Sequence, residues 1–145
     1  MFRPWKPIDA ELRCIPALRV CQDGLAATIT WEQWHKGICE FRMRIHFPTG
    51  VVAVLSVDES IHFAAPFIPT DAELTADDST PTPWPAWISD VNYRRPHYSS
   101  YAEEIYSSVV SYYIHGDDVV VLLDINGVDP EITVEHFPAS SPDSL

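Results

Sequence analysis

The sequence predicts an α+β fold that is mainly antiparallel β-sheet, with one or two short helices and a long proline-rich loop. Three observations predict it. Apolar and polar residues alternate through residues 39–47, the pattern of a strand with one buried and one solvated face. Asp-Gly, Pro-Thr-Gly and Asn-Gly turn signals separate short apolar runs. The 13 prolines and five tryptophans favour strands and loops over long helices.

The first half of the chain is predicted to be built from strands. Residues 15–31 form a predicted hairpin, because Asp23-Gly24 is a favoured tight-turn pair between two β-prone runs. Residues 31–37 are then expected to be a loop. Residues 51–57 are the predicted strand that returns after the turn, and their continuous apolar run indicates a strand covered on both faces.

Residues 64–96 hold most of a proline cluster, so regular structure is not expected there apart from a short helical turn near 71–74. A loop of this length in a compact domain is usually functional or mobile. Acids lie beside tryptophans in it, which is typical of a protein-binding loop in which charge steers and tryptophan anchors. The alternative is that the tryptophans pack back onto the core. The residues concerned are Asp71, Glu73, Asp77, Asp78, Trp84 and Trp87.

The best helix candidate begins at Ser100, because Ser100 and Glu103 have the spacing of a capping box. Ile105 and Val109 then fall four residues apart on one face of that helix. The helix is expected to be short, since residues 109–114 have the composition of a strand.

The segment His-Gly-Asp-Asp at residues 115–118 is predicted to be a hairpin loop between strands at 109–114 and 119–125. Glycine supplies the positive φ that a hairpin turn often needs, and aspartate tolerates turn conformations. A calcium site would need a longer acidic loop with more ligands. A further turn at Asn126-Gly127 is expected to lead into a short last strand.

The chain of 145 residues is expected to form one domain over residues 1–137, with 64–96 as an internal acidic loop and 138–145 as a disordered tail. Its predicted core consists of Phe41, Met43, Ile45, Phe47, Val52, Val54, Leu55, Ile105, Val109, Val120, Leu122 and Leu123.

The net charge of −12 lies entirely in the second half of the chain. Residues 1–70 hold seven acids and seven bases, whereas residues 71–145 hold fourteen acids and only Arg94 and Arg95. Such a field repels nucleic acid and attracts basic surfaces, so binding to DNA or RNA is not expected. The acidic half either keeps the protein soluble or steers it towards a basic partner.

The sequence predicts a cytoplasmic protein without a membrane segment. Its longest apolar runs are far shorter than the roughly 20 residues that cross a bilayer, and the N-terminal residues lack the apolar core of a signal peptide. The odd set of cysteines, Cys14, Cys21 and Cys39, is typical of reduced thiols, and their spacing does not suit a zinc site.

No familiar catalytic constellation is present in the sequence: there is no phosphate-binding glycine loop, nucleophile elbow or zinc-protease histidine pair. We therefore expect no enzyme activity, no cofactor and no metal. Arg42, Arg44 and His46 share the polar face of one predicted strand, where they either hold a phosphate or carboxylate or form a solvated face. Cys39 with His35 is a second candidate pair, although a thiol on an apolar face is usually inert.

Two segments resemble a protein family. "SYYIHGDDVVVLLDINGVDPEI" and "CEFRMRIHFPTGVVAVLSVDES" resemble the C-terminal and middle segments of small bacterial immunity proteins, the antitoxins of contact-dependent or type VI secretion systems. The shared pattern describes hairpins and their packing, so no residue role is carried over. The resemblance implies a cytosolic antitoxin that covers a secreted, basic toxin domain, for example a nuclease.

An immunity or inhibitor protein is thus the leading functional hypothesis, and its oligomeric state is left open. The expected partner-binding residues are Asp71, Glu73, Asp77, Asp78, Trp84, Trp87, Glu103, Glu104, Asp117 and Asp118. The alternative is a small β-rich enzyme or ligand-binding protein that uses the Arg42, Arg44 and His46 face. A third possibility is a structural subunit of an oligomer, joined through the tryptophan-rich loop.

Overall fold

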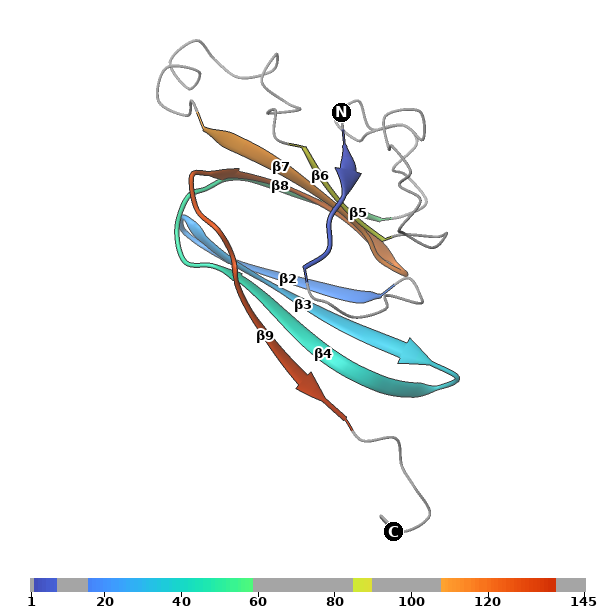
Figure 1. Cartoon of the computed structure of the whole chain (residues 1–145). Coiled ribbons are helices and arrows are strands. Elements are labelled where there is room, and N and C mark those ends of the chain that lie inside the picture. Colours follow the sequence, from blue (N-terminus) through green and yellow to red (C-terminus); the bar gives the residue numbers. More distant parts are fainter. Residues whose placement is uncertain (1, 8–15, 59–84, 90–107, 138–145) are drawn as a thin grey trace.

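The computed structural model describes residues 2–7, 16–58, 85–89 and 108–137. These residues form two antiparallel sheets that lie one over the other as a sandwich (Figure 1). The prediction of a mainly antiparallel β protein is confirmed. The predicted helical turn at 71–74, residues 100–107 of the second predicted helix and the tail at 138–145 lie outside the described residues, whereas Val109, expected on a face of that helix, begins a strand.

One sheet has five strands, in the order β1-β6-β7-β8-β5. They are β1 (Arg3–Pro4), β6 (Ala86–Ser89), β7 (Val109–His115), β8 (Val119–Asn126) and β5 (Val51–Asp58). The other sheet has four strands, in the order β2-β3-β4-β9. They are β2 (Ala17–Asp23), β3 (Ala26–His35), β4 (Ile38–Phe47) and β9 (Glu131–His136).

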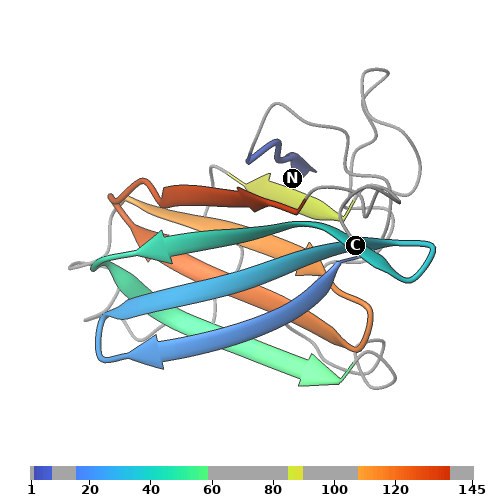
Figure 2. The same cartoon turned by 90° about the horizontal axis from the view of Figure 1, so that it is seen from below.

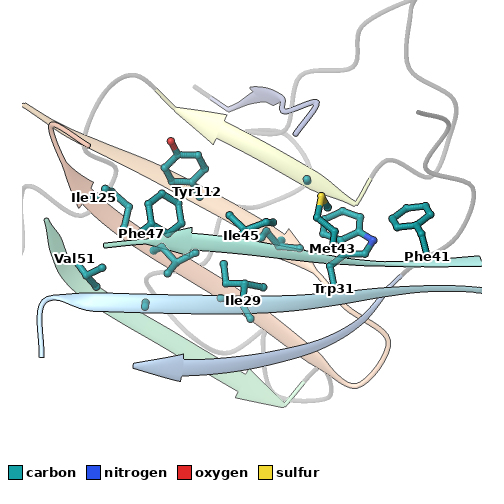
Figure 3. Packing of buried hydrophobic residues seen from close by; sticks show 14 residues of the cluster. Ile29, Trp31, Phe41, Met43, Ile45, Phe47, Val51, Tyr112 and Ile125 are labelled. Carbon is teal, nitrogen blue, oxygen red and sulfur yellow. The ribbon is translucent and has the colours of Figure 1, made fainter. Parts of the chain in front are cut away.

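The main core lies between the sheets and is built on the alternation of β4. Phe41, Met43, Ile45 and Phe47 are all buried there, as predicted, and Trp31 of β3 fills the space beside them (Figure 3). Val109, Val120, Leu122 and Leu123 of the predicted core are also buried, whereas Val52, Val54 and Leu55 are half-buried on the edge strand β5 and Ile105 lies outside the described residues.

A second apolar cluster lies on the opposite face of the five-stranded sheet. It consists of Phe2, Trp87, Tyr113, Val120 and Leu122, all of them buried. Because β8 is buried on both of its faces, it is a nearly continuous apolar run rather than an alternating one. The outer face of the four-stranded sheet is the polar one, and Figure 2 looks onto it, with β2, β3, β4 and β9 side by side.

Two sequence predictions of loops are wrong. Residues 31–35 were expected to be loop, but β3 continues to His35 and the turn consists only of Lys36 and Gly37. Both turn residues have positive φ, 51° and 76°, as a type I′ hairpin requires. Within the proline-rich segment, Ala86–Ser89 forms β6, because its prolines leave these four residues free to pair with β7.

Two of the connections between the sheets run beside each other. The chain leaves β4 for β5 at Gly50, and it leaves β8 for β9 just after Asn126, whose backbone N–H donates to the Gly50 carbonyl oxygen at 2.7 Å. The turn signal "PTG" therefore marks a crossover between sheets and not a hairpin. In consequence β4 and β9 pair in one sheet while β5 and β8 pair in the other.

The His-Gly-Asp-Asp segment is a hairpin loop between β7 and β8, as predicted, but its glycine has a different role from the one expected. Gly116 does not have a positive φ. A Cβ at Gly116 would lie 2.7 Å from the Val119 carbonyl oxygen and 2.8 Å from the Leu18 side chain. Close approach to β2 is what requires glycine here.

Candidate functional site

The structure places only three of the ten predicted partner-binding residues. Asp117 and Asp118 are exposed next to each other in the β7–β8 loop. Trp87, on β6, is only 8% exposed and packs in the second apolar cluster. That burial agrees with the alternative interpretation, in which the tryptophan packs onto the core, and leaves it unavailable as an anchor. The other predicted residues, Asp71, Glu73, Asp77, Asp78, Trp84, Glu103 and Glu104, lie outside the described residues.

The polar face of the four-stranded sheet carries side chains in cross-strand rows. Directly opposed residues in antiparallel strands point to the same face. Strand pairing therefore aligns Arg19 of β2, Thr30 of β3, Arg44 of β4 and Thr133 of β9 in one row. Thr30 lies between two arginines, which belong to strands that are not neighbours in the sheet.

This face is hollowed over its first strands. The hollow has a volume of about 430 Å³. It is lined by Ala17, Leu18, Arg19, Thr30, Glu32, Arg42 and Arg44. Three positive charges and one negative charge therefore surround it, although the protein as a whole carries a net charge of −12. We call this feature the arginine hollow.

Arg42 is the neutralised arginine of the three. Its Nε and Nη2 atoms both donate to Glu32 Oε2, at 3.1 and 2.9 Å, and its Nη1 lies 3.8 Å from Glu135. The hydrogen bonds to Glu32 raise the pKa of the Arg42 guanidinium. The guanidinium also lies over the Phe137 ring, 5.4 Å from its centroid. Arg42 is thus held in place from two neighbouring strands and the chain beyond β9.

Arg19 and Arg44 are in the opposite situation. Both are exposed, and within the described part of the chain neither forms an ion pair. Like charges that share one face of a sheet repel each other, and nothing described between them offsets that repulsion. They are the two arginines of the hollow that remain available to an anion.

The predicted Arg42, Arg44 and His46 trio is divided by the structure. Arg42 and Arg44 line the hollow, but His46 does not, and its Nδ1 is hydrogen-bonded to Thr28 Oγ1 at 2.9 Å in the next row. Arg19 takes the third place. The sequence held a signal for it: a two-residue turn after Asp23 sets the register of the hairpin and puts Arg19 opposite Thr30.

The Cys39 and His35 pair is not supported as a nucleophile and base. The Cys39 thiol donates to the Phe41 carbonyl oxygen at 3.4 Å. Burial raises the pKa of the Cys39 thiol, and the negative charge of Glu32 adds to the effect. A raised pKa leaves less of the reactive thiolate at neutral pH.

We expect Cys39 to react with iodoacetamide at least about tenfold more slowly than the exposed Cys21 at pH 7.5, because it has less thiolate and less access. Labelling rates should be read by peptide mass spectrometry in a Cys14→Ser background, so that only these two thiols compete. In urea the two rates should converge. Faster labelling of Cys39 than of Cys21 in the folded protein would contradict the assignment.

Neither the remaining structural features nor comparisons with known proteins narrow the class of function. Within the described ranges, no three His, Cys, Asp or Glu side chains come together as metal ligands do. The same residues include no helix of sufficient length and apolar character to cross a bilayer. No protein-family model, no curated protein and no solved structure matches the chain.

Proposed function

We propose that this protein is an immunity or inhibitor protein that binds a basic toxin domain, such as a nuclease, and covers its active site. Such a protein acts by occlusion and needs no catalytic residues. The observation that carries the proposal is the exposed acid pair Asp117 and Asp118 at one end of the sandwich, with no ion pair to either acid among the described residues.

The charge of the chain segment that carries this pair supports the proposal. Residues 108–137 contain six acids and no lysine or arginine. Of these acids only Asp124 is buried, where it accepts a hydrogen bond from the Ser111 hydroxyl at 2.8 Å. Exposed acids without ion pairs attract a basic partner over a distance of about 8–10 Å at ordinary salt concentrations and raise the rate of association.

The loop that carries the pair is also held in place. The Asp117 N–H donates to the Pro16 carbonyl oxygen at 2.8 Å, and the Gly116 N–H donates to the Val119 carbonyl oxygen at 2.8 Å. The aspartates therefore project from a backbone tied to the start of β2. A preorganised loop loses less conformational entropy on binding than a free one. The other acids predicted to bind the partner, Asp71, Glu73, Asp77, Asp78, Glu103 and Glu104, carry the same sign of charge.

The test is a charge reversal with a matched control. Tagged wild-type protein captures partners from host lysate at low salt, and mass spectrometry identifies them. The Asp117→Lys/Asp118→Lys variant is then compared with Asp23→Lys/Asp129→Lys, which makes the same change in net charge. Asp23 is the last residue of β2, whereas the Asp117 loop is hydrogen-bonded to the start of that strand. Asp23 and the loop therefore lie about 20 Å apart.

We expect one basic partner whose toxicity on expression is relieved by the wild-type chain. The Asp117→Lys/Asp118→Lys variant should weaken its binding at least about tenfold and reduce its salt dependence, whereas the control should change affinity less than about twofold. Equal losses in the two variants would show that only total charge matters. A partner that the protein binds without relieving toxicity would contradict the inhibitor role.

A further inference from the structure

We infer that the arginine hollow is a binding site for a compact phosphate-bearing small molecule, whose phosphate lies over Thr30 between Arg19 and Arg44. The acidic loop borders this hollow at the start of β2, where the Asp117 N–H donates to the Pro16 carbonyl oxygen, but the inference uses none of the loop's residues and does not depend on the toxin-binding proposal. The argument rests on the spacing of the two arginines, on the charge that they leave unbalanced, and on the shape of the hollow.

The spacing suits one anion held from two sides. Neighbouring strands are about 4.8 Å apart, so Arg19 and Arg44, two strands apart in one row, have Cα atoms separated by about 10 Å. Long arginine side chains from both positions can lean inward and meet above the short Thr30 side chain. Thr30 also lines the hollow, and its hydroxyl offers a further donor.

The charge favours a phosphate over a single carboxylate. One arginine fork satisfies both oxygens of a carboxylate, whereas a tetrahedral phosphate directs oxygens towards several donors at once. Two unpaired guanidinium groups also match the charge of roughly −1.5 to −2 of a phosphate monoester at pH 7. Glu32 does not oppose such a ligand strongly, because Arg42 already neutralises it with two hydrogen bonds.

The shape and lining set the size and kind of molecule. A volume of about 430 Å³ lies within the usual range of roughly 300–1,000 Å³ for small-molecule sites. None of the lining residues is aromatic, so the hollow offers no aromatic platform for a nucleobase. The acidic charge of the whole chain opposes a polynucleotide. A phosphate monoester with a compact polar body fits these properties.

Ala17 has the smallest side chain of the residues that line the hollow. Strand pairing places Ala17 in the same row as Glu32 and Arg42, on the polar face. A larger apolar side chain at this position would occupy the space over β2 and leave every charge in place. Ala17→Leu therefore separates the shape of the site from its electrostatics.

The test uses inorganic phosphate and glycerol 3-phosphate as probes, titrated calorimetrically at constant ionic strength, with succinate as a dicarboxylate comparison. The variants are Arg44→Gln, Arg19→Gln and Ala17→Leu. The control is Lys36→Gln, which removes one positive charge from the exposed β3–β4 turn. Circular dichroism verifies that each variant is folded; because Arg19, Arg44 and Lys36 are exposed, their replacement should leave the fold intact.

We expect saturable binding of glycerol 3-phosphate that is tighter than that of phosphate or succinate. Arg44→Gln and Arg19→Gln should each weaken it at least about tenfold, as expected for the loss of a charge-assisted bidentate contact, and Lys36→Gln less than about twofold. Ala17→Leu should weaken glycerol 3-phosphate more than inorganic phosphate. Equal or tighter binding of succinate would overturn the phosphate assignment. Equal losses in Arg44→Gln and Lys36→Gln, or no saturable binding to any probe, would overturn the site.

Discussion

Replacement of Trp31 with alanine is expected to lower the free energy of unfolding by about 3–5 kcal/mol. Trp31 is fully buried between the sheets, in register with Met43 of β4. Its Nε1 donates to Gln33 Oε1 at 3.2 Å inside the core. The substitution therefore leaves a large cavity and also removes a buried hydrogen bond. Because small domains are stable by only about 5–15 kcal/mol, much of the stability of this protein would be lost.

Two further variants separate the causes. Trp31→Phe keeps most of the ring volume but loses the hydrogen bond to Gln33, and we expect a loss of about 1–2 kcal/mol from it. Trp34→Ala is the matched control, since Trp34 lies on the same strand and is 45% exposed; it should cost less than about 1 kcal/mol. Urea unfolding followed by circular dichroism at 25 °C gives all three values. Similar losses for Trp31→Ala and Trp34→Ala would contradict the placement of Trp31 at the centre of the core.

The hydrogen bond between Trp31 and Gln33 lies in the part of β3 that was predicted to be a loop. Residues 31–37 contain Glu, Gln, His and Lys, which indicate a loop by composition. In the structure Gln33 is 1% exposed, and its side-chain oxygen accepts the Trp31 hydrogen bond. A buried amide with a local partner is compatible with a core, but composition does not reveal the partner. The pairing of β3 with β4 also shifts register between Gln33 and Trp34, which disturbs the alternation there.

The part of the candidate site that lies on a single strand could be predicted from the sequence. Alternation along β4 placed Arg42 and Arg44 on the polar face. Arg19 joins them through pairing across β3, and the ion pairs of Arg42 reach both neighbouring strands. The position of Arg19 follows from the register of the β2–β3 hairpin, whereas the contact between Arg42 and Glu135 follows from sheet order. Sheet order could not be obtained from local patterns, because a Pro-Thr-Gly turn has the same sequence signal whether the next strand pairs back or crosses to the other sheet.

Gly50 is the residue at which the chain crosses from the four-stranded sheet to the five-stranded sheet. Its φ is +78°, and a Cβ there would lie 2.7 Å from the backbone oxygen of Asn126 and 2.8 Å from Val128 Cγ2. We expect Gly50→Ala to lower the free energy of unfolding by about 2–4 kcal/mol, because left-handed backbone strain and overlap with the second crossover act together. The measurement is urea unfolding of the variant beside wild type. Any movement that relieves the overlap would strain the 2.7 Å hydrogen bond between Asn126 N–H and the Gly50 oxygen.

Gly24→Ala separates strain from overlap. Gly24 has a similar φ of +59° in the β2–β3 turn, but no atom lies within 4 Å of the position of its Cβ. Gly24→Ala should lower the free energy of unfolding by only about 1 kcal/mol, because only the backbone conformation is strained. The excess loss at Gly50 then measures the close approach of the two crossovers. If Gly24→Ala and Gly50→Ala lowered the free energy of unfolding equally, the two crossovers would not be tightly packed against each other. The pairing of β9 beside β4, which places Glu135 against Arg42, would then need another cause.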